Sequence, residues 1–244
     1  MDAFRTVTAI AAPIAWANVN TDDIFPGPAA SPVVRAGNVA AMADRAQMGP
    51  NAFAAHRWND DLSPKSEFIL NQPPYDQAGV LVAGENFGCG SSREMAVWCL
   101  QAIGIRAVIA PSFGDIFYNN CFKNGLLPVR LERKAVEHLL ALVQVPETAQ
   151  ITVDLESQVV TAADGSCYGF DPGAYQRQLL LDGLDEITAT LRRLEQITAA
   201  EHAYFARRPW LAEGGLVEGG LVEGGLAEGG LVKGALAEGT LGHG

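Results

Sequence analysis

The residues of this 244-residue chain that could do chemistry gather in one short stretch, Gly88-Cys89-Gly90-Ser91-Ser92-Arg93-Glu94. Its glycines let the backbone approach a ligand closely, and two hydroxyls and a guanidinium stand beside them. The next residues, through Ile103, have the apolar spacing of a helix, whose first turn presents unpaired N–H groups and a partial positive charge. These groups predict a site for a carboxylate or a phosphate. In the alternative interpretation, Ser92 only caps the helix.

This stretch does not match the common phosphate-binding or nucleophile motifs. A dinucleotide-binding GxGxxG would need glycine where Arg93 stands, and a Walker loop would need lysine where Ser91 stands. The nucleophile elbow GxSxG would need glycine where Glu94 stands. A nucleotide-binding module is therefore a weak hypothesis.

The elements around this stretch predict an α/β fold. Gly79–Ala83 and Ala107–Ala110 are unbroken apolar runs, as in buried strands, and the helix Arg93–Ile103 lies between them. A second helix, Asp115–Asn124, and a strand, Leu126–Leu131, follow. This alternation predicts a parallel sheet covered by helices. The other predicted elements are strands at Phe4–Ala11 and Phe68–Leu70, a short helix within Val39–Phe53, a loop at Ala17–Pro28, a helix at Glu132–Val143, a strand or hairpin at Ile151–Val160 with its turn at Ala163-Asp164-Gly165, a helix from Asp171-Pro172 to Leu180, and helix over Ile187–Phe205.

Composition excludes several classes of function. A net charge of −11 argues against nucleic acid as the main partner, because phosphate binding needs a basic surface. No apolar stretch approaches the 18 residues of a membrane span, and the apolar segment Ala9–Ala17 is short and holds a proline, so we expect neither membrane attachment nor secretion. The four cysteines and four histidines form no CxxC, HxxxH or HExxH pattern. We therefore expect reduced thiols, no metal site and a cytoplasmic location.

Residues 211–244 differ from the rest of the chain. They hold 12 of the 26 glycines and place leucine at every fifth position, as in LVEGG, a period that fits neither helix nor strand. This predicts a folded part over residues 1–210 and a biased tail over 211–244. A pentapeptide solenoid and a partner-docking segment are alternatives for the tail, and we expect a disordered extension.

Four segments carry a resemblance to a known family. GENFGCGSSRE, at residues 84–94, and APSFGDIFYNNCFKNGLLPV, at 110–129, resemble the 3-isopropylmalate dehydratase small subunits of the aconitase superfamily. ANVNTDDIFP, at 17–26, is similar to that family's ANVDTDQIIP, and GLDEITATLRRLEQITAAEHAYFARRPW, at 183–210, to its C-terminal end. The resemblance implies a swivelling three-layer β/β/α domain of the aconitase C-terminal type. It also implies a separate large subunit, in a heterodimer or heterotetramer, that holds a [4Fe–4S] cluster, and no cofactor on this chain.

The resemblance assigns roles to the stretch at residues 88–94. The family's reaction removes water from a 2-hydroxy dicarboxylate and returns it with the hydroxyl moved. By similarity to aconitase, Ser91 would be the base, as an alkoxide that a helix N-terminus, backbone N–H groups and Arg93 would stabilise. Arg93 would also grip a substrate carboxylate with two hydrogen bonds, and Ser92 and Gly90 would complete this part of the substrate site.

The resemblance also implies that two further segments bind the substrate. Val33-Val34-Arg35-Ala36-Gly37 is similar to the family's V-T-R-T-G, which makes Arg35 a second substrate anchor; the alternative is an ordinary surface arginine. Asp22 matches the second acid of the family's DTD, so Thr21 and Asp22 are expected at the site; the alternative is a turn or helix cap.

Several residues depart from the family pattern and leave the substrate open. Asn20 and Asp23 stand where the family has Asp and Gln, Met95 replaces its usual His, and the region Arg35–Trp58 is longer than in the common members. Isopropylmalate is the expected substrate, with homoaconitate, citraconate or a methylated maleate as alternatives. A non-catalytic carboxylate-binding interaction subunit is the alternative from another class. His56 and His138 are expected to be structural or surface residues.

Overall fold

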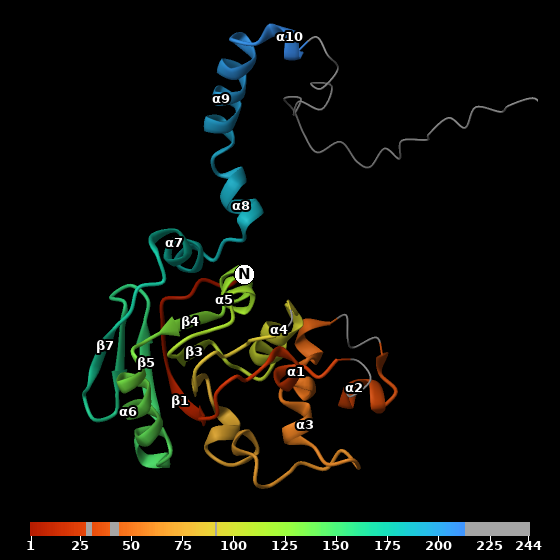
Figure 1. Cartoon of the computed structure of the whole chain (residues 1–244), viewed down its shortest axis with the longest axis vertical. Coiled ribbons are helices and arrows are strands. Elements are labelled where there is room, and N and C mark those ends of the chain that lie inside the picture. The colour runs from red at the N-terminus through yellow and green to blue at the C-terminus, as the bar shows by residue number, and fades with distance from the viewer. Residues whose placement is uncertain (28–30, 40–43, 91, 213–244) are drawn as a thin grey trace, which may run out of the picture. The chain divides into compact units, whose positions relative to one another are not determined.

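Seven strands form one curled sheet in the computed structural model, which describes residues 1–27, 31–39, 44–90 and 92–212 (Figure 1). The strands are β1 (Thr6–Ile14), β2 (Val80–Ala83), β3 (Ala107–Ala110), β4 (Leu127–Arg130), β5 (Gln150–Asp154), β6 (Val159–Ala162) and β7 (Cys167–Gly169). Their order in the sheet is β4-β3-β2-β1-β5-β6-β7. The predicted α/β class is confirmed.

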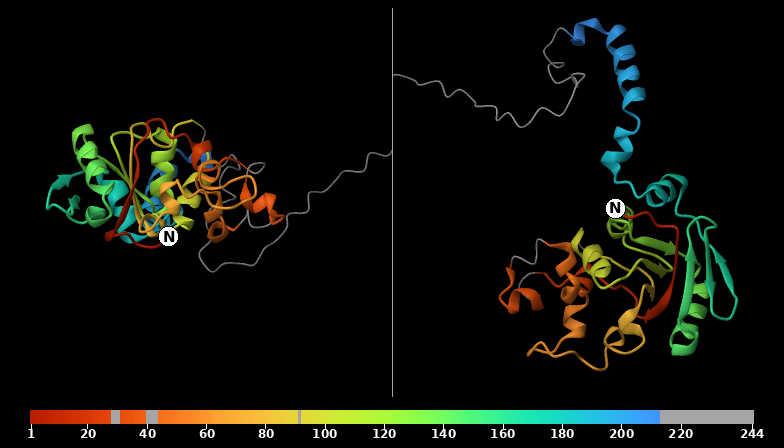
Figure 2. Two further views of the ribbon diagram at one scale, coloured as in Figure 1. Left: turned by 90° about the horizontal axis from the view of Figure 1, so that it is seen from below. Right: turned by 180° about the vertical axis from the view of Figure 1, so that it is seen from behind.

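Strand β1 changes partner halfway along its length. Its second half, from Ala11 to Ile14, pairs parallel with β2. Its first half, from Thr6 to Ile10, pairs antiparallel with β5. Strand β1 therefore joins a parallel half of the sheet, which continues through β3 and β4, to an antiparallel half that continues through β6 and β7 (Figure 2).

The parallel half contains the βαβ units that the sequence predicts. Every residue of β2 and β3 is buried, which explains why both strands are unbroken apolar runs rather than alternating ones. The α-helices among the described residues are α1 (Thr21–Ile24), α2 (Pro32–Arg35), α3 (Ala54–Arg57), α4 (Met95–Ala102), α5 (Asp115–Asn124), α6 (Arg133–Val143), α7 (Ala174–Asp182), α8 (Glu186–Leu191), α9 (Leu194–Ala206) and α10 (Pro209–Ala212). Helix α6 packs on β1, β2 and β3, while α5 packs on α4 and β4. Both helices have the predicted bounds to within one residue.

Short 3-10 helices fill the connections before β2. They span Arg45–Gln47, Gly49–Asn51, Ile69–Asn71 and Tyr75–Gln77, and another, Pro146–Thr148, follows α6. The strand predicted at Phe68–Leu70 is therefore wrong. The Phe68 N–H donates to the nearby Lys65 carbonyl, and the Asn71 N–H donates to the Phe68 carbonyl, so local turns take the place of a sheet partner.

Two other predicted elements differ in detail. The segment Ala17–Pro28, predicted as a loop, contains the one-turn helix α1, which begins with a capping box between Asn20 and Asp23. The predicted strand or hairpin at Ile151–Val160 is the pair β5 and β6. The turn at Ala163-Asp164-Gly165 joins β6 to β7, with Gly165 at a φ of +86°.

The chain divides into two compact units, Met1–Arg192 and Arg193–Gly244. The second unit is described as far as Ala212 and contains α9 and α10, and no residue of α9 is buried. Of the tail predicted at residues 211–244, the first two residues, Leu211 and Ala212, belong to α10. Residues 213–244 lie outside the described part of the chain. None of the described helices is both long enough and apolar enough to cross a membrane.

Candidate active site

The predicted site loop lies beside the segment that contains α1, although about 70 residues separate them in sequence. Asn20 and Cys89 form a parallel bridge, the Gly88 N–H donates to the Val19 carbonyl at 2.7 Å, and the Thr21 N–H donates to the Cys89 carbonyl at 2.8 Å. Backbone hydrogen bonds thus fix the start of α1 against the loop that leaves β2.

Two glycines of the loop are required by its geometry. Gly88 has a φ of +73°, and a Cβ placed on it would lie 2.2 Å from Cγ of the Phe117 ring, which is inside any possible contact distance. Gly90 has a φ of +92°, and its Cβ would lie 3.8 Å from the Thr21 hydroxyl oxygen. Gly88 therefore allows close packing on α5, while Gly90 supplies a left-handed turn immediately before Ser91.

Arg93 and Asp22 form an ion pair next to this turn. Nη1 of Arg93 donates to the Asp22 carboxylate and, at 3.3 Å, to the Phe25 carbonyl at the end of α1. The side chains of Arg93 and Asp22 are 36% and 58% exposed, so the pair lies at the surface, while Thr21 beside it is buried. A surface ion pair is worth only about 0–1 kcal/mol, so Asp22 holds the Arg93 guanidinium weakly.

Only one of the two serines of the loop, Ser92, lies among the described residues. Ser91 lies outside them. Ser92 is exposed and precedes the N-cap of α4, which is Glu94 and makes no side-chain capping bond. The interpretation of Ser92 as the helix cap is therefore wrong, because the helix begins at Met95 instead of Arg93. The structure thus brings Thr21, Asp22, Gly90 and Arg93 together.

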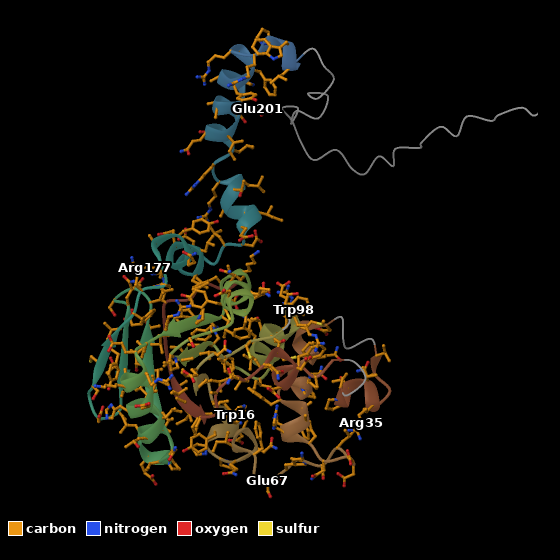
Figure 3. All side chains as sticks on the ribbon, viewed as in Figure 1. Trp16, Arg35, Glu67, Trp98, Arg177 and Glu201 are labelled. Atoms are coloured by element: carbon orange, nitrogen blue, oxygen red, sulfur yellow. The ribbon has the colours of Figure 1, made fainter. Side chains whose placement is uncertain are left out.

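Arg35 lies apart from this cluster. It ends α2, and its guanidinium donates to the Asp60 carbonyl. It lines an open cavity of about 480 Å³ together with Trp58 and Lys65, to which neither Arg93 nor Asp22 contributes. Figure 3 shows Arg35 on the outer side of the first unit, away from Trp98 of α4. The predicted pairing of the two arginines around one substrate is thus not formed in this arrangement of the chain.

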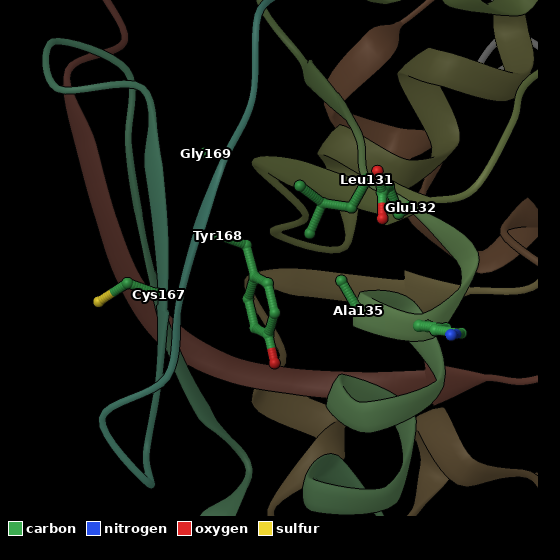
Figure 4. A pocket seen from close by; sticks show the side chains of 7 residues that line it. Leu131, Glu132, Ala135, Cys167, Tyr168 and Gly169 are labelled. Atoms are coloured by element: carbon green, nitrogen blue, oxygen red, sulfur yellow. The ribbon is translucent and has the colours of Figure 1, made fainter.

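The two histidines considered in the sequence contact aromatic and acidic neighbours. The His56 ring stacks on Phe68, and its Nε2 lies 3.4 Å from the Asp23 carboxylate. His138 of α6 lies 2.5 Å from the Tyr168 hydroxyl through Nδ1 and 3.2 Å from the Asp164 carboxylate through Nε2. The Tyr168 side chain extends from β7 toward α6 and lines a cavity of about 520 Å³, to which none of the predicted site residues contributes (Figure 4).

The cysteines do not form a ligand set. Burial raises the pKa of the Cys99 thiol to about 12 and the pKa of the Cys121 thiol well above its usual value, which disfavours the thiolate that binds metals. Cys89 lies in the site loop and Cys167 on β7. Among the described residues, no three His, Cys, Asp or Glu side chains come close enough to hold a metal ion.

A helix cap is the alternative for Thr21 and Asp22, but the structure forms a capping box from their neighbours Asn20 and Asp23. Asp23 accepts from the Asn20 N–H at 2.9 Å, and the Asn20 side chain accepts from the Asp23 N–H at 2.8 Å. The pattern of Asn followed three residues later by an acid could have revealed this helix start. The box orients Thr21 and Asp22, which lie between its two members, toward the loop of Gly90.

Comparison with known proteins shows which class of domain this fold belongs to. The aconitase C-terminal domain family matches residues 1–134, and the family LeuD_N matches residues 137–171. A 3-isopropylmalate dehydratase from Methanocaldococcus jannaschii has a similar crystal structure, with a TM-score of 0.55 and 28% identity over 80% of this chain and 99% of that one. The protein is thus an aconitase C-terminal type domain.

Curated relatives narrow this class to one family. The 3-isopropylmalate dehydratase small subunit of Roseobacter denitrificans is 44% identical over 86% of this chain and 100% of its own length. The small subunit of Gluconobacter oxydans is 45% identical over 83% of this chain and 92% of its own length. The chain belongs to the family of 3-isopropylmalate dehydratase small subunits.

Proposed function

We propose that this chain is the small subunit of a hydro-lyase that interconverts 2-isopropylmalate and 3-isopropylmalate in leucine biosynthesis, in the cytoplasm. One observation carries the proposal: the guanidinium of Arg93 lies at the surface, beside the turn at Gly90 and the buried Thr21. Such an arrangement suits the carboxylates of a small dicarboxylate substrate. The 44–45% identity to curated small subunits over most of the chain supports the same reaction.

In this proposal the loop supplies the base and one carboxylate anchor. Ser91 takes the proton next to a substrate carboxylate, and Arg93 both binds that carboxylate and favours the charged form of the serine. Ser92 donates a further hydrogen bond, and Gly90 keeps backbone close to the substrate. Asp22 holds the guanidinium until substrate arrives, because its weak surface pairing with Arg93 is easily exchanged.

The remaining groups come from outside this loop. Arg35 serves as the second anchor after the assembled enzyme brings α2 toward the loop. A large subunit joins the chain in a heterodimer or heterotetramer and holds a [4Fe–4S] cluster, which supplies the Lewis acid for the departing hydroxyl. The described part of this chain has no group of residues suited to that cluster.

The test is an assay of the chain in complex with its large subunit. Isopropylmalate, homoaconitate, citraconate and methylated maleate are supplied separately, and the chain alone serves as the control. We expect turnover with isopropylmalate and none by the chain alone. No turnover of isopropylmalate, with turnover of another of these acids, would assign the chain to a related dehydratase. An assembled complex that binds the acids and turns over none would make it a non-catalytic subunit.

The tail is proposed to take no part in this activity. The tail, residues 211–244, carries the pentapeptide pattern, and its first two residues end α10. Truncation after Trp210 is expected to leave kcat/KM and complex formation within about twofold of the full chain, since a segment that cannot bury a core orders at an entropic cost. Size-exclusion chromatography and a steady-state assay check this result, and loss of either property would show that the tail docks on the partner.

A further inference from the structure

Asn124, the last residue of α5, is a buried centre of hydrogen bonds. Its side-chain amide donates to the Glu94 carboxylate at 2.7 Å and to the Asn120 carbonyl at 2.9 Å, and its Oδ1 accepts from the Trp98 indole N–H at 2.9 Å. Its backbone carbonyl accepts from the Gln101 side chain at 2.6 Å. Asn124 is only 6% exposed, so these bonds replace its contacts with water.

Chemistry allows only one orientation of this amide. The Trp98 indole can only donate, so it must face Oδ1, and an ionised Glu94 can only accept, so it must face Nδ2. Asn124 therefore uses both of its amide hydrogens and its oxygen, which fixes its side chain on α5. Glu94 and Trp98 lie four residues apart and thus on one face of the helix start, where the same amide holds both.

Glu94 connects this centre to the active-site loop. It follows Arg93 directly and is the N-cap of α4, and its carbonyl accepts from the Val97 N–H at 3.0 Å. Asn124 therefore holds the residue at which the chain passes from the loop into α4. The position of Glu94 determines where the Arg93 backbone lies, and hence where its guanidinium reaches.

We propose that Asn124 is a positioning residue for the active site, which acts through the Glu94 carboxylate on the loop that carries Ser92 and Arg93. The inference rests on the proposed function, because it concerns the same carboxylate-binding loop. It extends that function to a residue on another helix, 30 positions away from Glu94 in sequence. It also gives Glu94 a task that requires a hydrogen-bond acceptor and not a negative charge.

Paired substitutions at the two ends of this bond test the proposal. In the complex with the large subunit, Asn124→Asp removes the donors and sets two carboxylates against each other, so kcat/KM is expected to fall about 10- to 100-fold, mainly through KM. Glu94→Gln keeps an acceptor and should stay within about threefold of wild type. The double variant N124D/E94Q reverses the direction of the bond to residue 94 but leaves a carboxylate oxygen facing the Asn120 carbonyl, so kcat/KM should recover about three- to tenfold over N124D without reaching wild type. Asn119→Asp, the same change at an exposed position of α5, is the matched control.

A second measurement does not depend on activity. Amide hydrogen exchange on the full chain should be faster at Ala96, Val97 and Trp98 in N124D than in the Asn119→Asp control, and slower again in the double variant. If the wild-type complex turns over none of the acids, the proposed function fails while this exchange still tests the positioning role.

Three results would overturn the role of Asn124. The first is equal exchange and kinetics in N124D and the Asn119→Asp control. The second is no recovery in a folded, assembled double variant. The third concerns Glu94→Ala, the variant to use if N124D does not fold. Amide exchange and a KM equal to those of the wild type in Glu94→Ala would also contradict the role of Asn124.

Discussion

Replacement of Ser91 by alanine is expected to abolish turnover in the complex with the large subunit and to leave assembly intact. General-base catalysis contributes about 10²- to 10⁴-fold to a rate, and no other hydroxyl is proposed to take the substrate proton. Alanine keeps the Cβ of serine and removes only its hydroxyl oxygen, so the fold should not change. The loss should therefore appear in kcat, measured in single-turnover and steady-state assays with isopropylmalate.

Two controls separate this result from damage to the protein. Ser157→Ala makes the same change at an exposed residue between β5 and β6 and should keep full activity. Complex formation by S91A should match wild type in size-exclusion chromatography. Activity of S91A within about threefold of wild type would refute the assignment of Ser91 as the base.

Arg93→Lys is expected to lower kcat/KM by about 10²- to 10³-fold although the positive charge remains. Lysine cannot form the two parallel hydrogen bonds that a guanidinium makes with a carboxylate. It also loses the planar group whose Nη1 contacts Asp22 and the Phe25 carbonyl, so it is held less firmly at the end of α1. Loss of one electrostatic stabiliser of a developing charge commonly costs this much.

The kinetic pattern of Arg93→Lys reveals which role dominates. A rise in KM at constant kcat indicates that Arg93 only binds the substrate carboxylate, while an equal fall in kcat and kcat/KM indicates stabilisation of the transition state. Arg5→Lys, at the exposed ion pair with Glu156, is the matched control and should have no effect. Wild-type kcat/KM in Arg93→Lys would exclude Arg93 as a substrate anchor.

Local elements of the fold were predictable because their signals are local. The run Ala107–Ala110 is β3 without any change in bounds, and α5 ends at Asn124 because Gly125 takes a left-handed φ of +82°. The amphipathic pattern of Glu132–Val143 gives α6, which buries Val136, Leu139 and Val143. Such patterns depend on residues within a few positions of one another.

The arrangement of the sheet and most of the site were not predictable in this way. Nothing in Thr6–Ile14 indicates that its two halves have different partners, because those partners lie far along the chain. The pairing of Asp22 with Arg93 joins residues 71 positions apart, and it follows from the bridge between Asn20 and Cys89. The family resemblance supplied the identity of these residues, while their contacts come only from the folded chain.

The divided pairing of β1 has a consequence for how the protein is made. Its second half finds β2 after about 80 residues have been synthesised, but its first half must wait for β5 at residues 150–154. At roughly 5–20 residues per second, that edge stays unpaired on the ribosome for several seconds after β2 has emerged. An open strand edge is a template for association with other chains. The nascent protein therefore exposes the first half of β1 to pairing with other chains until β5 has been made.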